Sequence, residues 1–127
     1  MKLVEMSEEL SVIKLQAQAA IPNWAFQGSF FSITRTADEL SVVCESRLVP
    51  SDIHLKEKNW KCLKVQGPLD FSLTGILSSI ANPLAAAKIS IFAISTFDTD
   101  YVMVKNDNLK KAKLALQQAG FEIEEKN

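Results

Sequence analysis

The chain has 127 residues, of which 47% are hydrophobic and 23% charged, and its formal net charge is −1. This length suits one compact domain or two very small fused ones, and the apolar content is too high for a disordered protein. A nearly neutral chain gives no electrostatic basis for binding nucleic acid or an anionic membrane.

The sequence lacks the features of secreted, membrane-bound and catalytic proteins. Cys44 and Cys62 lie within apolar runs and nothing in the sequence pairs them, which fits a reducing compartment. The N-terminus has no signal-peptide pattern, and no uncharged run reaches the ~20 residues of a membrane-spanning helix. His54 is the single histidine, so we expect neither a metal centre nor a histidine-based triad. We therefore expect a cytoplasmic protein that is not an enzyme and uses no cofactor.

The first half of the chain is predicted to be mainly β-structure. Apolar runs predict strands over 10–15, 30–34 and 40–44. The short connection across 37–39 makes the last two strands a hairpin. The polar stretch 50–59 is expected to be a loop.

The second half is predicted to mix strands with two helices. Strands are predicted over 60–66, 89–94 and 100–104, helices over 73–87 and 109–119, and a short final strand or packed tail over 121–123. This order predicts an α+β fold of the ferredoxin-like βαββαβ type. Such a fold has a four-stranded antiparallel sheet with both helices on one face.

Residues at the helix ends predict how the helices start and stop. Asp70 or Ser72 is expected to cap the first helix. Pro83 is expected to kink or break it near Ile80, because proline removes a backbone donor. Gly120 is expected to end the second helix in the left-handed conformation.

The two halves share an internal repeat. At an offset of 61, residues 31–34 overlay 92–95 and residues 40–43 overlay 101–104, while 12–16 match 62–66 at an offset of 50. The first half is therefore about eleven residues shorter where the second half has its first helix. Either the two hairpins resemble each other by chance, or the chain holds two copies of one module. In the second case the first copy has reduced helices and must share a core with the complete copy.

Four stretches of the second half form a specific pattern: 65–72 (VQGPLDFS), 74–77 (TGIL), 80–85 (IANPLA) and 94–101 (ISTFDTDY). With these stretches the chain resembles the ACT domain, a small module that binds amino acids and regulates metabolic enzymes. The resemblance is closest to the tandem ACT type of the arginine-sensing CASTOR proteins and their small bacterial relatives. It covers residues 60–125 well and the first sixty loosely. The family usually has glycine after the first helix where this chain has Lys88, so we expect that corner to close differently.

The resemblance implies a reduced ACT-like half over residues 1–59 and a complete ACT domain over 60–127, packed as one unit. It implies a free amino acid as the effector. It also implies a homodimer or a partner protein, because ACT modules commonly pair their sheets edge to edge. The expected function is a non-enzymatic regulatory module that binds an amino acid. The alternative is a structural or oligomerisation module that has lost its ligand.

The start of the first predicted helix is the candidate site for the ligand's carboxylate. Thr74, Gly75 and Ile76 lie in its first turn, where free N–H groups and the helix dipole favour an anion. Gly75 would let a ligand approach the backbone closely. The alternative is that Gly75 only allows the helix and the sheet to pack tightly.

The loop after the 89–94 strand is the candidate site for the ligand's ammonium group. Asp98 and Asp100 are expected to lie at the same edge of the sheet, although Asp98 could simply form the turn. The resemblance implies that Asp100 contacts the side chain of the bound amino acid and that the backbone near Thr96 and Phe97 lines the pocket. Phe97 could instead plug the core.

The first half is expected to lack a complete site. In the repeat Glu39 falls opposite Asp100, and Arg35 and Thr36 stand where the second half has Thr96 and Phe97. Without a first helix, this copy has no helix N-terminus to hold a carboxylate. We therefore expect at most one site per chain, placed where two modules meet.

Overall fold

The computed structural model describes residues 1–70 and 74–125. The chain forms two compact units, a larger unit of residues 1–7 and 61–127 and a smaller unit of residues 8–60. Strands β1 (Lys2–Leu15) and β4 (Lys56–Val65) each contribute one part to each unit.

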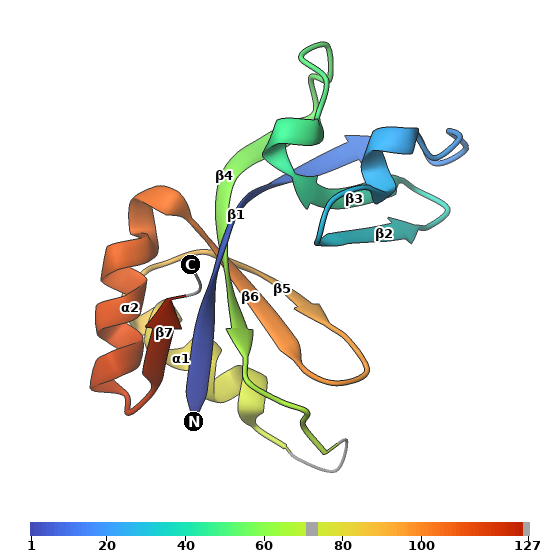
Figure 1. Cartoon of the computed structure of the whole chain (residues 1–127). Coiled ribbons are helices and arrows are strands. Elements are labelled where there is room, and N and C mark those ends of the chain that lie inside the picture. The colour runs from blue at the N-terminus through green and yellow to red at the C-terminus, as the bar shows by residue number, and fades with distance from the viewer. Residues whose placement is uncertain (71–73, 126–127) are drawn as a thin grey trace. The chain divides into compact units, whose positions relative to one another are not determined.

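The larger unit combines a β-sheet with two α-helices (Figure 1). Besides its parts of β1 and β4, it contains β5 (Ile91–Ser95), β6 (Asp100–Lys105), β7 (Glu122–Glu125), α1 (Ile76–Ala86) and α2 (Leu109–Gln118). The strand order within this unit is β7-β1-β4-β6-β5, and β5 and β6 are antiparallel. The predicted α+β class is confirmed.

The first residues of the chain add a strand that the sequence did not predict. The prediction starts the first strand at residue 10, whereas β1 starts at Lys2 and lies between β7 and β4. Its pairing with β7 is parallel, with Lys2 opposite Glu122. Leu3 is fully buried in the core of this unit and anchors a stretch that otherwise looks polar. The described residues of the larger unit therefore form five strands rather than the four predicted, and the β1–β7 pair is parallel.

One hydrophobic core joins both helices to the sheet. Its fully buried members are Leu3, Leu63, Val65, Ile80, Leu84, Val102, Val104, Ala112 and Leu116. Because α1 and α2 both contribute to this core, they cover the same face of the sheet, as predicted. Lys113 of α2 adds a polar connection, since its ammonium forms ion pairs with Glu5 of β1 and Glu125 of β7.

Helix α1 starts later than predicted and has no side-chain cap. Its N-cap is Gly75, which has a left-handed φ of 77°. Asp70 is therefore not the cap, while Ser72 and Leu73 lie outside the described residues.

Pro83 was predicted to kink or break α1 near Ile80; the break is wrong, and the kink stays a prediction. The helix runs without interruption to Ala86 with Pro83 inside it. Proline removes only one backbone hydrogen bond. Ile80 and Leu84, which flank it, are fully buried and hold this part of the helix on the core.

Both helices end in a Schellman motif. After α1, Lys88 N–H donates to Ala85 O and Ile89 N–H donates to Leu84 O, both at 2.9 Å. After α2, Gly120 N–H donates to Gln117 O and Phe121 N–H donates to Leu116 O, both at 3.0 Å. The left-handed residue has a φ of 62° at Lys88 and 100° at Gly120. The prediction for Gly120 is confirmed. The expectation that Lys88 closes its corner differently is wrong, because this lysine adopts the conformation that favours glycine.

The smaller unit is built from antiparallel strands with short turns of 3₁₀-helix. It contains β2 (Phe31–Arg35), β3 (Leu40–Glu45), η1 (Asn23–Phe26) and η2 (Ser46–Leu48) besides its parts of β1 and β4. Strands β2, β3 and β1 are neighbours in that order, and residues 8–60 hold no α-helix. The core of this unit comprises Ile13, Ala25, Leu40, Val42 and Cys44. Strand β4 starts at Lys56, inside the stretch predicted as a loop.

The hairpins of the two units have the same pairing, which corrects the offset of the repeat. Arg35 pairs with Leu40 in the first hairpin, and Ser95 pairs with Asp100 in the second. In both hairpins a threonine closes the turn: Thr36 N–H donates to Glu39 O (2.9 Å), and Thr96 N–H donates to Thr99 O (2.8 Å). The two hairpins therefore match at an offset of 60 rather than 61. The offset of 61 followed hydrophobic similarity alone, whereas the turn sets the register.

With this register, the counterparts assigned from the sequence change. Thr36 corresponds to Thr96, and Asp38 corresponds to Asp98. Leu40, not Glu39, corresponds to Asp100.

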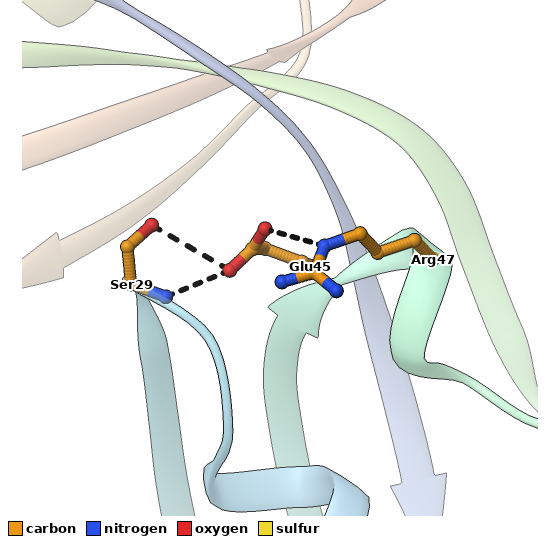
Figure 2. A network of polar contacts seen from close by, with 3 residues as sticks. All are labelled: Ser29, Glu45 and Arg47. Carbon is orange, nitrogen blue, oxygen red and sulfur yellow. Dashed lines mark hydrogen bonds and ion pairs between the residues drawn. The ribbon is translucent and has the colours of Figure 1, made fainter.

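A buried carboxylate organises the smaller unit (Figure 2). Glu45 is 6% exposed and accepts hydrogen bonds from the Ser29 N–H (2.7 Å) and from Arg47 Nε (3.1 Å). Gly28 has a left-handed φ of 83°, and a Cβ there would lie 2.0 Å from Glu45 Oε2. Burial raises the pKa of the Glu45 carboxyl, but the bonds from Ser29 and Arg47 outweigh burial and leave this pKa below its ordinary value.

Replacing Glu45 is expected to destabilise the protein at neutral pH and to make its free energy of unfolding depend less on pH under acidic conditions. Glu45→Gln should lower the free energy of unfolding by about 1–3 kcal/mol at neutral pH, because charged hydrogen bonds are lost. A lowered folded pKa means that the carboxylate stabilises the fold above the ordinary glutamate pKa, and that this contribution is lost as the pH falls through the folded pKa. Urea unfolding between about pH 6 and pH 3 should therefore show a smaller loss in the variant than in the wild type. The exposed Glu9→Gln serves as control, and equal slopes for all three proteins would contradict the prediction.

The two Schellman motifs make a matched pair for testing backbone strain. Lys88→Gly should raise the free energy of unfolding by roughly 1 kcal/mol, because glycine adopts a positive φ without a steric cost. Gly120→Ala should lower it by a similar amount for the converse reason. Thermal unfolding measures both. A Lys88→Gly protein that melts below the wild type would mean that the lysine side chain itself stabilises this corner.

Candidate functional site

A cavity of about 310 Å³ lies between the start of α1 and the turn that joins β5 to β6. It is lined by Leu69, Asp70, Gly75, Ile76, Leu77, Ser95, Thr96, Phe97, Asp98, Thr99 and Asp100. All of these residues belong to the larger unit. The volume lies at the lower end of the ~300–1,000 Å³ that is usual for small-molecule sites.

The wall formed by α1 offers backbone donors. The first intrahelical bond runs from Ser79 N–H to Gly75 O (2.9 Å), so the preceding amides of the first turn have no helical acceptor. No acidic residue lies in this turn. Among the described residues, a Cβ on Gly75 would meet only Ser78 Oγ, at 3.7 Å, so close packing against them is not the reason for this glycine. Its left-handed φ is the reason, and the resulting helix start suits an anion.

The opposite wall is acidic. Asp100 is partly buried at the start of β6 and accepts a hydrogen bond from Ser95 Oγ (2.6 Å). Asp98 lies in the turn and Asp70 in the segment that precedes α1, and both are exposed. Within residues 1–70 and 74–125, no lysine, arginine or histidine lines the cavity. The arrangement favours a ligand with a positive charge on this side.

Two hydrogen bonds hold the acidic turn to the chain that leads into α1. Thr99 is 4% exposed, and its hydroxyl donates to Val65 O (2.6 Å) at the end of β4. Leu69 N–H donates to Asp98 O (2.7 Å). Gly67 makes this approach possible, because a Cβ there would lie 3.1 Å from Asp98 O and 3.2 Å from the Thr99 side chain.

The structure brings together six of the seven residues predicted from the sequence. Gly75, Ile76, Thr96, Phe97, Asp98 and Asp100 line the cavity, whereas Thr74 does not. Phe97 is 79% exposed at the rim, so it does not plug the core. That these six residues contact a ligand stays a prediction.

Sequence reasoning missed five lining residues: Leu69, Asp70, Leu77, Ser95 and Thr99. Ser95 and Thr99 flank the predicted loop residues and could have been found from the hairpin pairing. Asp70 was considered only as a helix cap.

A smaller hollow of about 190 Å³ shares Thr96, Asp98 and Thr99 with the cavity. It is also lined by Lys64 and Tyr101, and Lys64 Nζ lies 6.0 Å from the centre of the Tyr101 ring. Burial raises the pKa of the Tyr101 hydroxyl, and the charge of Asp98 adds to the shift. The ammonium group of Lys64 and the carboxylate of Asp98 thus line the same hollow.

The described residues offer neither a metal centre nor a membrane anchor of the helical kind. Among them, no group of three histidine, cysteine, aspartate or glutamate side chains is placed to hold a metal ion. No helix in the described ranges has both the length and the apolar character needed to cross a bilayer.

Comparison with known families finds two matches. The model of the ACT domain matches residues 55–118, and the model of an N-terminal domain matches residues 7–52. The first match covers half of the chain and includes every residue that lines the cavity.

Similar proteins include a human sensor and two solved structures. The human cytosolic arginine sensor for mTORC1 subunit 1 is 34% identical over 96 residues, which are 70% of this chain but 29% of the sensor. A crystal structure of a protein from Agobacterium tumefaciens is 40% identical, with a TM-score of 0.93, and the match covers 99% of this chain and 93% of that one. The structure of aspartate kinase from Clostridium acetobutylicum is 14% identical, with a TM-score of 0.64. The match covers 89% of this chain and 33% of the kinase, and it shows a shared fold.

Removing the Thr99 hydroxyl is expected to loosen the acidic turn. Thr99→Val keeps the shape of the side chain but leaves the buried Val65 carbonyl without this donor, which should cost about 1–3 kcal/mol of stability. Thr99→Ser keeps the hydroxyl and is the matched control. Urea unfolding measures both variants, and a Thr99→Val protein as stable as Thr99→Ser would contradict the prediction.

Proposed function

The chain belongs to the ACT domain family, and we propose on this premise that it is a non-enzymatic regulatory module that binds a free amino acid. The proposed site is the cavity between the start of α1 and the turn from Thr96 to Thr99. The observation that carries the proposal is that helix amides without an intrahelical acceptor and acidic side chains line one cavity from different sides.

The α-carboxylate is proposed to bind at the start of α1. Its partners would be the amides of Ile76 and Leu77, which belong to the first turn and line the cavity. These donors precede the first intrahelical bond, and the helix dipole adds to the attraction. Gly75 leaves the approach open, since no side chain projects from it.

The positively charged groups of the ligand are proposed to face Asp98 and Asp100. Asp100 is the better contact, because it is partly buried and Ser95 Oγ holds one of its oxygens. The described lining residues include three carboxylates and no cation, so an amino acid with a cationic side chain suits the cavity better than an acidic one. The similarity to an arginine sensor supports the same ligand class.

Regulation is proposed to pass through a second copy of the chain or a partner protein. Phe97 supports this part of the proposal, because it is 79% exposed at the rim of the cavity and is large and apolar. A bound ligand beside Phe97 would change the surface that it presents.

A screen of the twenty amino acids by thermal shift, followed by calorimetry, tests the proposed ligand. A ligand that binds only the folded state at 100 times its Kd should stabilise the protein by about 2.7 kcal/mol. We expect arginine or lysine to raise Tm and aspartate or glutamate to leave it unchanged. No shift with any amino acid at millimolar concentration, together with a stable dimer by light scattering, would favour the structural module instead.

Replacing Asp100 tests the site itself. Asp100→Asn should weaken binding by roughly ten- to a hundredfold, as expected for the loss of a charged hydrogen bond worth about 1.5–3 kcal/mol. Asp107→Asn is the matched control, because Asp107 is an exposed residue of η3 (Asn106–Asn108) and does not line the cavity. Unchanged affinity in Asp100→Asn would mean that the ligand binds elsewhere.

A further inference from the structure

The smaller hollow beside the cavity lies on the face of the sheet opposite α1 and α2. Successive side chains of a strand point to opposite faces. Leu63 of β4 and Val102 of β6 belong to the core that the helices cover. Their neighbours Lys64 and Tyr101 therefore point to the other face, where both line the smaller hollow. Asp100, on the helix side of β6, lines the cavity instead, so the two spaces are distinct.

A cation and a carboxylate line the smaller hollow without forming an ion pair. They are Lys64 and Asp98. Lys64 is partly buried, and within the described ranges its ammonium has no carboxylate partner; it lies 6.0 Å from the centre of the Tyr101 ring. The Asp98 carboxylate likewise has no ion pair in the part of the chain that the structure describes. Both charges are thus available to a molecule in the hollow.

The turn that forms one wall of the hollow is held in place by hydrogen bonds. The Thr99 hydroxyl donates to Val65 O (2.6 Å), and the Thr96 hydroxyl donates to Thr99 O (3.1 Å). Both hydroxyl protons are therefore committed to the fold. A ligand would be recognised mainly by the charges of Lys64 and Asp98, which project from a wall that does not have to rearrange.

This pair of charges suits a ligand that carries both signs. An anion would be attracted by Lys64 but repelled by Asp98, and a simple cation would meet the reverse. A zwitterion satisfies both groups, because its carboxylate can bind Lys64 while its ammonium binds Asp98. The hollow has a volume of about 190 Å³, below the ~300 Å³ at which small-molecule sites usually begin, so the ligand must be small.

We propose that the smaller hollow is a separate site for a small zwitterionic amino acid, with the carboxylate at Lys64 and the ammonium at Asp98. Glycine is the simplest ligand of this class, because it has no side chain to accommodate. Asp98 lines both spaces, whereas Lys64 lines the hollow and not the cavity, and Asp100 lines the cavity and not the hollow. Variants at Lys64 and Asp100 therefore separate the two sites.

Glycine titration tests the hollow, followed by thermal shift and by NMR of the backbone amides. We expect glycine at tens of millimolar to raise the Tm of the wild type and to shift the amide signals of Thr96 and Tyr101. Lys64→Met keeps the apolar stem without the charge and should weaken glycine binding at least about tenfold. Lys64→Arg keeps the charge and should still bind. Lys111→Met is the matched control, because Lys111 is exposed on α2 and lines neither space.

Acetate and methylammonium, which each carry one of the two charges of glycine, should give a much weaker response. A response to acetate as strong as that to glycine would identify an anion site and overturn the inference. The same holds for a wild type that does not respond to glycine, and for a glycine response that persists in Lys64→Met, which would be a general solute effect.

The proposed function of the cavity is tested separately with Asp100→Asn. This variant should lose the cationic amino acid but keep glycine. Glycine binding without any binding of a cationic amino acid would support the site in the hollow and contradict the proposed function. Binding of a cationic amino acid without glycine binding would contradict the site in the hollow alone.

Discussion

The candidate site depends on one short connection, the pair of hydrogen bonds that ties the acidic turn to the end of β4. The Thr99 hydroxyl donates to Val65 O, and Leu69 N–H donates to Asp98 O, at 2.6 and 2.7 Å. Both bonds involve backbone carbonyls, so they fix the path of the chain rather than the rotamer of one side chain. Gly67 favours this close approach, because a Cβ there would lie 3.1 Å from Asp98 O and would push the turn away slightly. The core that α1 shares with β6 places the two elements, and this connection ties the chain that leads into α1 to the acidic turn itself.

The parts of the fold that the sequence predicts are those whose local chemistry agrees with the tertiary structure. The two hairpins follow from β-branched residues around short polar turns, and α2 follows from Leu109, Ala112 and Leu116 together with Gly120. The first part of β1 and the start of β4 were missed for one shared reason. Their sequences are mostly polar, and pairing with neighbours far along the chain makes them strands.

The sequence located the start of α1 to within a few residues, but it did not predict which residue is the N-cap. Asp70 is a good capping residue, yet the N-cap is Gly75, whose left-handed φ redirects the chain. The residues of the acidic turn were found because they lie close together in sequence. Ser95 and Thr99 were missed, because their place in the site follows from the register of β5 and β6, which the hydrophobic pattern alone does not set.

Charge separates the two walls of the cavity and thereby sets the orientation of the proposed ligand. The first turn of α1 has no acidic side chain, whereas Asp98 and Asp100 line the cavity from the hairpin and Asp70 lines it from the segment that precedes α1. A carboxylate placed near the aspartates would meet repulsion from several like charges, and an ammonium placed at the helix start would oppose the dipole. Under the proposed function, a free amino acid would therefore have one favourable orientation. An acidic side chain would add a second carboxylate near the aspartates, so the charges that would orient a cationic amino acid would disfavour an acidic one.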